Sequence, residues 1–359
     1  MNPPALEEMN ATTATAARTT KPAPSAPVGL VAASAPPLRL PAEHFAAALL
    51  FWVLGSLGLV WVAPEIARGL FPLPRVAAVT HLFTLGWITT TILGALYQFL
   101  PVALQTPIRS ERLAHLTFVL YAPGLALFVG GLLFGRHTPM LAGAALFGTG
   151  LLLFVANLAA TLRRAPERNL TWWALAGAAL FLTATTALGA ALAGNLRWHY
   201  LGAERFTALG VHLHVAIAGW VMLVIVGVAH RLLPMFLLSH GASERPGRVA
   251  LTLLAGGSAL LLLLHHALSP LAVWGVALLL AGGLGAFLVQ ATLFFRHRRK
   301  PTLDPGLRLA GIALVFTGAA LTLAPFVIVH GVHAPRLATA YVLALILGGL
   351  SLFVGGHYY

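Results

Sequence analysis

The chain has 359 residues, of which 59% are apolar and only 9% are charged. A soluble domain is about one quarter charged, so this composition predicts a chain surrounded mostly by lipid. It excludes a soluble enzyme, a nucleic-acid-binding domain and a disordered chain. Cysteine is absent, which excludes disulfides, thiolate metal sites and iron–sulfur clusters. The 15 histidines outnumber the 9 acidic residues, and this excess requires a functional explanation.

Residues 1–40 differ from the rest of the chain. They are rich in Ala, Thr and Pro and contain no sustained apolar run. We expect a disordered, cytoplasmic N-terminal tail over 1–40 and a transmembrane helical domain over 41–359. The tail lacks the compact apolar region of a signal peptide.

From residue 41 onward the chain is a series of apolar runs, each long enough to cross a bilayer as a helix. Because the runs are continuous rather than alternating, they exclude a β-barrel. The sequence therefore predicts an all-α, polytopic transmembrane helix bundle. Its ten expected spans cover about 44–63, 76–101, 113–135, 140–162, 170–193, 206–236, 248–267, 270–295, 307–330 and 337–356.

Basic residues predict the orientation of these spans. With the N-terminus inside, 16 of the 22 Lys and Arg residues fall on the cytoplasmic side and 6 on the other. This bias follows the positive-inside rule and supports ten spans with both termini in the cytoplasm. The net charge of +13 is thus mostly an orientation signal, and gives no indication of nucleic acid. We expect an integral protein of a bacterial or archaeal inner (plasma) membrane, in contact with lipid and able to form a homo-oligomer.

The second and sixth runs carry the same landmarks at a constant shift of 133 residues. In order they are His81, Gly86, Trp87, Gly94 and Pro101 in one run, and His214, Gly219, Trp220, Gly227 and Pro234 in the other. The same shift relates the third run to the seventh and the fourth to the eighth. We infer a duplicated four-helix unit plus two extra helices, which form an incomplete third copy without the histidine.

A parallel repeat of this kind has its axis along the membrane normal. We therefore expect His81 and His214 to lie at the same depth and to face each other. Two such imidazoles can supply both axial ligands of a heme iron. The alternative is that they form interhelical hydrogen bonds only. His212 lies two residues before His214, about 200° around the helix, so it can serve a second metal centre or lie in interfacial water.

Further residues complete the expected heme site. Trp87 and Trp220 are placed to line the ring. Heme propionates need cationic partners at the non-cytoplasmic edge, where Arg75, Arg205 and Arg336 open the second, sixth and tenth runs. Interfacial Arg and Trp residues are also ordinary membrane anchors.

The residues His212-Leu213-His214, followed by Gly219-Trp220 and by Leu233-Pro234, resemble the histidine-x-histidine helix of subunit I of the heme–copper oxidase superfamily. That superfamily includes the nitric oxide reductases, and the NnrS family is similar in composition and histidine use. The resemblance implies heme b, with His81 and His214 on a low-spin heme. It also implies that His212 ligates a high-spin heme beside copper or non-heme iron.

Four more histidines end helices on the same expected side as His212. They are His265, His266, His330 and His333. His265 and His266 resemble the copper-ligand pair of the oxidases, and His330 and His333 would complete such a metal site. The other interpretation is that all four are interfacial histidines.

These observations predict a heme-binding membrane protein that transfers electrons or binds and reduces a diatomic gas, with nitric oxide ahead of oxygen. An electron-donor protein or a quinol would be its partner. No acidic residue lies in the middle of a run, which argues against proton pumping and favours a non-pumping, heme-dependent oxidoreductase. Two alternatives stay open. One is a non-enzymatic heme-, metal- or gas-responsive protein, and the other is a transporter with a pseudo-twofold cavity.

Overall fold

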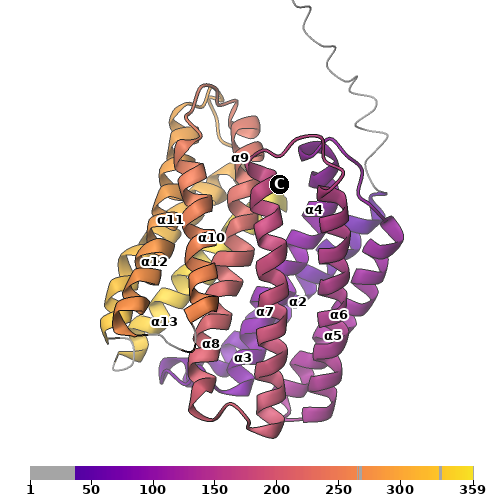
Figure 1. Cartoon of the computed structure of the whole chain (residues 1–359), viewed down its shortest axis with the longest axis vertical. Helices are drawn as coiled ribbons and strands as arrows, with labels where there is room; N and C mark the ends of the chain where they lie inside the picture. The colour runs from indigo at the N-terminus through magenta and orange to yellow at the C-terminus, as the bar shows by residue number, and fades with distance from the viewer. Residues whose placement is uncertain (1–36, 265, 267–268, 331–333, 359) are drawn as a thin grey trace, which may run out of the picture.

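The computed structural model describes residues 37–264, 266, 269–330 and 334–358. Every regular element in these ranges is helical, and ten helices among them are long and apolar enough to cross a membrane. They form a bundle of roughly parallel and antiparallel helices (Figure 1). The prediction of an all-α, polytopic membrane bundle is confirmed, and the protein is an integral membrane protein.

Seven of the spans are single α-helices. They are α2 (Arg39–Ala67), α5 (Glu111–Leu133), α6 (His137–Leu162), α7 (Leu170–Trp198), α10 (Arg245–Leu264), α11 (Pro270–Arg296) and α12 (Pro305–His330). Their bounds agree with the predicted runs to within a few residues. The short break before α11 is real, because Ser269 caps the helix with a 3.2 Å hydrogen bond from Ala272 N and Pro270 occupies its first turn.

The other three spans are the second, sixth and tenth, and each contains a π-helix. The second is α3 (Pro74–His81), η1 (Leu82–Thr89) and α4 (Thr90–Ala103). The sixth is the 3₁₀ turn η2 (Gly202–Glu204) with α8 (Arg205–His214), η3 (Val215–Met222) and α9 (Leu223–Leu237). The tenth is α13 (Pro335–Leu343), η4 (Ala344–Ser351) and α14 (Leu352–Gly355), followed by the 3₁₀ turn η5 (Gly356–Tyr358).

The three π-helices are equivalent and identify three repeated units. Each is eight residues long, and each contains a glycine that faces a phenylalanine of the unit's first helix. The pairs are Gly86 with Phe51, Gly219 with Phe181, and Gly348 with Phe316. The incomplete third copy predicted from the sequence is therefore a structural unit with the same internal packing.

The units follow one another in a ring. The first unit is α2 to α6, the second is α7 to α11, and the third is α12 to η5. Contacts of α6 with α7 and of α11 with α12 join consecutive units, and a contact of α13 with α2 joins the third to the first. Figure 1 shows the C-terminus near the end of the bundle where α9 finishes. We call this the basic end, because Arg39, Arg163, Arg248 and Lys300 lie at the helix ends there.

Candidate functional site

Two histidines from different units meet at the interface of the first and second units. His81 ends α3 and His212 lies near the end of α8. Their ring centroids are 6.4 Å apart and their planes are inclined by 29°. Two imidazoles that bind one metal ion from opposite sides have centroids about 6 Å apart, because each metal–nitrogen bond is about 2.0 Å. We call His81 and His212 the histidine pair.

The backbone around each ring prepares it to act as a ligand. Nδ1 of His81 donates a 2.7 Å hydrogen bond to the carbonyl of Ala77. A carbonyl only accepts, so the lone pair of this imidazole is on Nε2, as in most metal-bound histidines. Nδ1 of His212 is buried, and the ring lies beside the backbone of Thr185. A Cβ at Gly189 would lie 3.0 Å from Cε1 of His212, so this glycine leaves the space that the ring occupies.

The structure places His212, rather than the expected His214, beside His81. The side chain of His214 is exposed on another face of α8, as the 200° separation requires. The facing of His81 and His214 was inferred from a twofold repeat. In a ring of three units, however, equivalent residues point toward successive neighbours rather than toward each other. His81 therefore faces the second unit. There it meets His212, which lies two positions before His214, the equivalent of His81 in that unit.

The interface of the third and first units obeys the same relation. Leu343 is the equivalent of His81 in the third unit, and Val79 lies two positions before His81 in the first. Both line one apolar cavity of about 50 Å³ between these units. Leu343 and Val79 thus hold at this interface the sequence positions that His81 and His212 hold at the other.

His214 repeats the local geometry of His81 in the second unit. Its Nδ1 donates a 2.8 Å hydrogen bond to the carbonyl of Gly210, which is the equivalent of Ala77. Its lone pair is thus on Nε2 as well. Because His214 is exposed, this lone pair lies on a ring that the protein does not enclose.

The tryptophans predicted to line a heme ring have other contacts. The ring of Trp87 stacks on Tyr358 at 5.2 Å, and Nε1 of Trp220 donates a 3.2 Å hydrogen bond to Thr89. Neither ring has a described contact with the histidine pair. Contact of these two tryptophans with a heme stays a prediction.

The predicted propionate partners lie at the end opposite the basic end. Arg75 contacts Glu65 at 3.3 Å. Arg205 donates a 2.9 Å hydrogen bond to the carbonyl of Gly202. Arg336 is exposed in the first turn of α13. All three therefore lie at one end of the bundle, and their place at the membrane edge and their role with an anion stay predictions.

The second metal centre expected from four histidines is not assembled by the described residues. His265 and His333 lie outside them. His266 approaches Glu204 at 3.9 Å, and His330 is exposed at the end of α12. No three His, Asp or Glu side chains in the described ranges are grouped as metal ligands would be. A cavity of about 410 Å³ opens near the basic end between α11 and α12, on residues such as Arg296 and Val315, and contains none of the predicted site residues.

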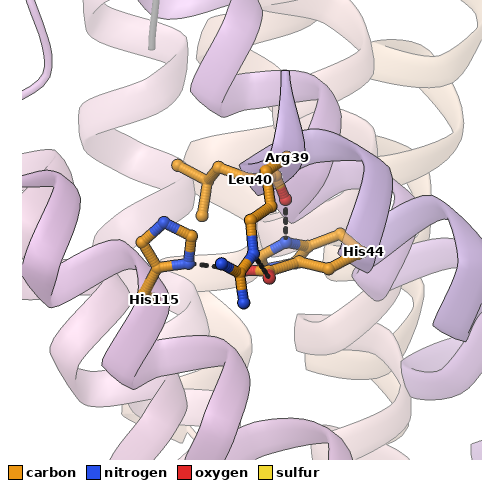
Figure 2. A network of polar contacts seen from close by, with 5 residues as sticks. Arg39, Leu40, His44 and His115 are labelled. Carbon is orange, nitrogen blue, oxygen red and sulfur yellow. Dashed lines mark hydrogen bonds and ion pairs between the residues drawn. The ribbon is translucent and has the colours of Figure 1, made fainter. Parts of the chain in front are cut away.

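A polar network near the basic end was missed by the sequence analysis. His115 of α5 contacts Glu43 of α2 at 2.8 Å, and Arg39 approaches the same carboxylate at 3.9 Å. The next residue, His44, is fully buried, and its Nδ1 donates to the carbonyl of Leu40 (Figure 2). Glu43 is one of the acidic residues that lie outside the middle of an apolar run. The spacing of Arg39 and Glu43 was a sequence signal, but the contact with His115 spans 72 residues.

Comparisons with known proteins leave the site to be interpreted from its geometry. No protein-family model matches the chain, and no match to a curated protein was found.

Proposed function

We propose that this chain is a heme-b-binding membrane protein of the heme–copper oxidase type, in which His81 and His212 hold a low-spin heme. The observation that carries the proposal is the 6.4 Å separation of two rings from different units. The hydrogen bond from Nδ1 of His81 to Ala77, which leaves the lone pair on Nε2, supports it. When bound, such a heme supplies reversible one-electron transfer.

The residues around the pair would position it and keep water away. The hydrogen bond to Ala77 fixes the tautomer and the orientation of His81. The ring of Phe128 lies edge-on to His81 at 5.3 Å, and Gly189 admits the ring of His212. Burial among apolar helices lowers the local dielectric, and this is one of the properties by which a protein sets a heme potential.

His214 is the ligand that we assign to a second centre, where a diatomic gas would bind. Applied to the second and third units, the relation that pairs His81 with His212 would bring Tyr341 toward His214. His214 would then be the one histidine that holds this centre. Nitric oxide or oxygen would bind here, and electrons would arrive from a quinol or a donor protein through the histidine pair. We place the basic end in the cytoplasm, following the positive-inside rule.

Spectroscopy of the purified full-length chain and its histidine variants tests these assignments. We expect a red protein whose EPR spectrum shows low-spin heme. His81→Ala and His212→Ala should each remove the low-spin signal. His214→Ala should leave that signal and abolish the binding of carbon monoxide to the reduced protein. His230→Ala is the matched control, since His230 also lies on the sixth span and donates through Nδ1 to a carbonyl, that of Val226.

Two results would reject the proposal in different ways. A colourless protein that cannot be reconstituted with heme would refute heme binding altogether. A low-spin signal that survives His212→Ala but disappears in His214→Ala would restore the twofold pairing and refute the threefold one. Reduced protein that binds no carbon monoxide would favour a non-enzymatic heme protein with the histidine pair alone.

A further inference from the structure

The interface of the second and third units contains the cavity of about 410 Å³ near the basic end. Its walls are α11 and α12, which lie side by side (Figure 1). Leu288 and Phe295 line it on α11, and Gly311 and Val315 line it on α12. A Cβ at Gly311 would have no neighbour within 4 Å, so this wall faces open space. We call it the α11–α12 cavity.

At the equivalent place between the first and second units, a tryptophan ties the two helices together. Nε1 of Trp172 on α7 donates a 2.9 Å hydrogen bond to the carbonyl of Leu162, the last residue of α6. Because Phe181 and Phe316 hold the same position in α7 and α12, the equivalent of Trp172 in the third unit is Leu307. A leucine side chain is smaller and has no N–H to donate, so this tie cannot form between α11 and α12. These two helices are accordingly the less closely packed pair.

Both walls of the cavity change from basic to apolar with depth. Arg296 and Leu288 line the α11 wall eight residues apart, which is about 12 Å along a helix. On α12, Arg308 precedes Gly311 by three residues and Val315 by seven, so the three share one helix face. One leaflet contributes about 15 Å of hydrocarbon. The cavity therefore reaches from the charged edge of the membrane through most of one leaflet.

The arginines at the open end carry positive charge that the chain itself does not neutralise. Between residues 296 and 308 there are five basic residues and one acidic residue, Asp304. The carboxylate of Asp304 is paired with Lys300 at 2.6 Å. Arg298 and Arg308 each donate a 3.0 Å hydrogen bond to a backbone carbonyl. A guanidinium has five N–H donors, so each of these arginines keeps donors for an anion.

We propose that the α11–α12 cavity binds an anionic phospholipid from the leaflet at the basic end. The phosphate group binds Arg296, Arg298 and Arg308, and an acyl chain lies between the helices against the apolar walls. Basic pockets between transmembrane helices suit anionic headgroups. A further transmembrane helix is about 10–12 Å across, so a cavity of about 410 Å³ that is about 12 Å deep cannot hold one. The lipid thus joins the second unit to the third, where the tryptophan tie is missing.

Native mass spectrometry of the full-length chain in detergent micelles tests the headgroup contact. We expect the chain to retain dioleoylphosphatidylglycerol in preference to dioleoylphosphatidylcholine, which has the same acyl chains and no net charge. Excess inorganic phosphate should not displace the retained lipid. Each basic residue near an anionic lipid strengthens binding about fivefold, so Arg296→Gln combined with Arg308→Gln should weaken it about 25-fold. Arg163→Gln is the matched control and should bind normally, because Arg163 is the equivalent of Arg296 at the first interface.

A second variant blocks the cavity without changing its charge. The leucine side chain in Gly311→Leu would enter the open space between the helices, so we expect loss of the retained phosphatidylglycerol. Gly275→Leu is the control, since a Cβ there also has no neighbour within 4 Å and the residue lies near the opposite end of α11. This variant should retain the lipid as the unmodified chain does.

Each part of the proposal has a result that would overturn it. Equal retention of the two lipids, or normal binding by the double arginine variant, would refute the anionic headgroup site. Normal binding by Gly311→Leu would refute the position of the acyl chain. Displacement by inorganic phosphate would assign the arginines to a soluble anion, and displacement by decylubiquinone would assign the cavity to a quinone. None of these results depends on heme, so the lipid site and the proposed function fail separately.

Discussion

Replacement of Gly219 by alanine tests the contact that repeats in all three units. A Cβ at this position would lie 2.7 Å from both Cβ and Cγ of Phe181, well inside the 3.4–4 Å of ordinary contact. The Cβ of Phe181 is fixed by the backbone of α7, so no side-chain rotation removes this contact. The helices must therefore separate locally, and overpacking of this kind costs about 1–3 kcal/mol.

Gly256→Ala on α10 provides the matched control. A Cβ there has no neighbour within 4 Å. Both substitutions replace glycine by alanine within a helix, and both gain up to about 1 kcal/mol of helix propensity. The difference between the two variants therefore isolates packing, and we expect Gly219→Ala to be the less stable by about 1–3 kcal/mol.

The assay is equilibrium unfolding of both variants in mixed detergent micelles, followed by circular dichroism and tryptophan fluorescence. Equal free energies of unfolding for the two variants would refute the close approach of η3 to α7. Adding Phe181→Ala to Gly219→Ala should restore part of the loss, because residues in contact are energetically coupled.

Two further predictions concern the histidine pair and the C-terminus. The leucine side chain in Gly189→Leu would occupy the space of the His212 ring, so we expect loss of the low-spin signal. Gly275→Leu is the control and should retain the signal, because a Cβ at Gly275 has no neighbour within 4 Å. A normal spectrum for Gly189→Leu would remove His212 from the site. Burial raises the pKa of Tyr358 to about 12, against the opposing effect of its 2.9 Å hydrogen bond with Thr91. The contribution of Tyr358 to stability is therefore complete below pH 10 and is lost as the pH rises through about 12. Tyr358→Phe should cost about 1 kcal/mol of stability and should reduce this alkaline loss in a thermal melt.

The fold was largely predictable from the sequence because its main determinants are local. Apolar length defines a span, and Pro270 or Ser269 marks a boundary without reference to the rest of the chain. The third unit was also visible as a partial repeat. The π-helices were not predicted, because an additional residue in a helical turn does not alter composition or apolar length.

The candidate site was only partly predictable, because its partners depend on assembly. Helical periodicity correctly placed His212 and His214 on different faces, but it does not state which neighbour each face meets. The number of units decided that, and a ring of three exchanged the roles of the two histidines. The contact of Glu43 with His115 was missed for the same reason, since most of α2 and the whole second span lie between these residues in the sequence.

The recurrence of a π-helix at one position in all three units has an evolutionary consequence. A single ancestral unit that already contained the π-helix accounts for all three copies. The chemistry at the interfaces diverged afterwards, to two histidines at one, to leucine and valine at another, and by the same relation to histidine and tyrosine at the third. The backbone is thus the feature that the units share, and the interface of Leu343 and Val79 shows it without histidines.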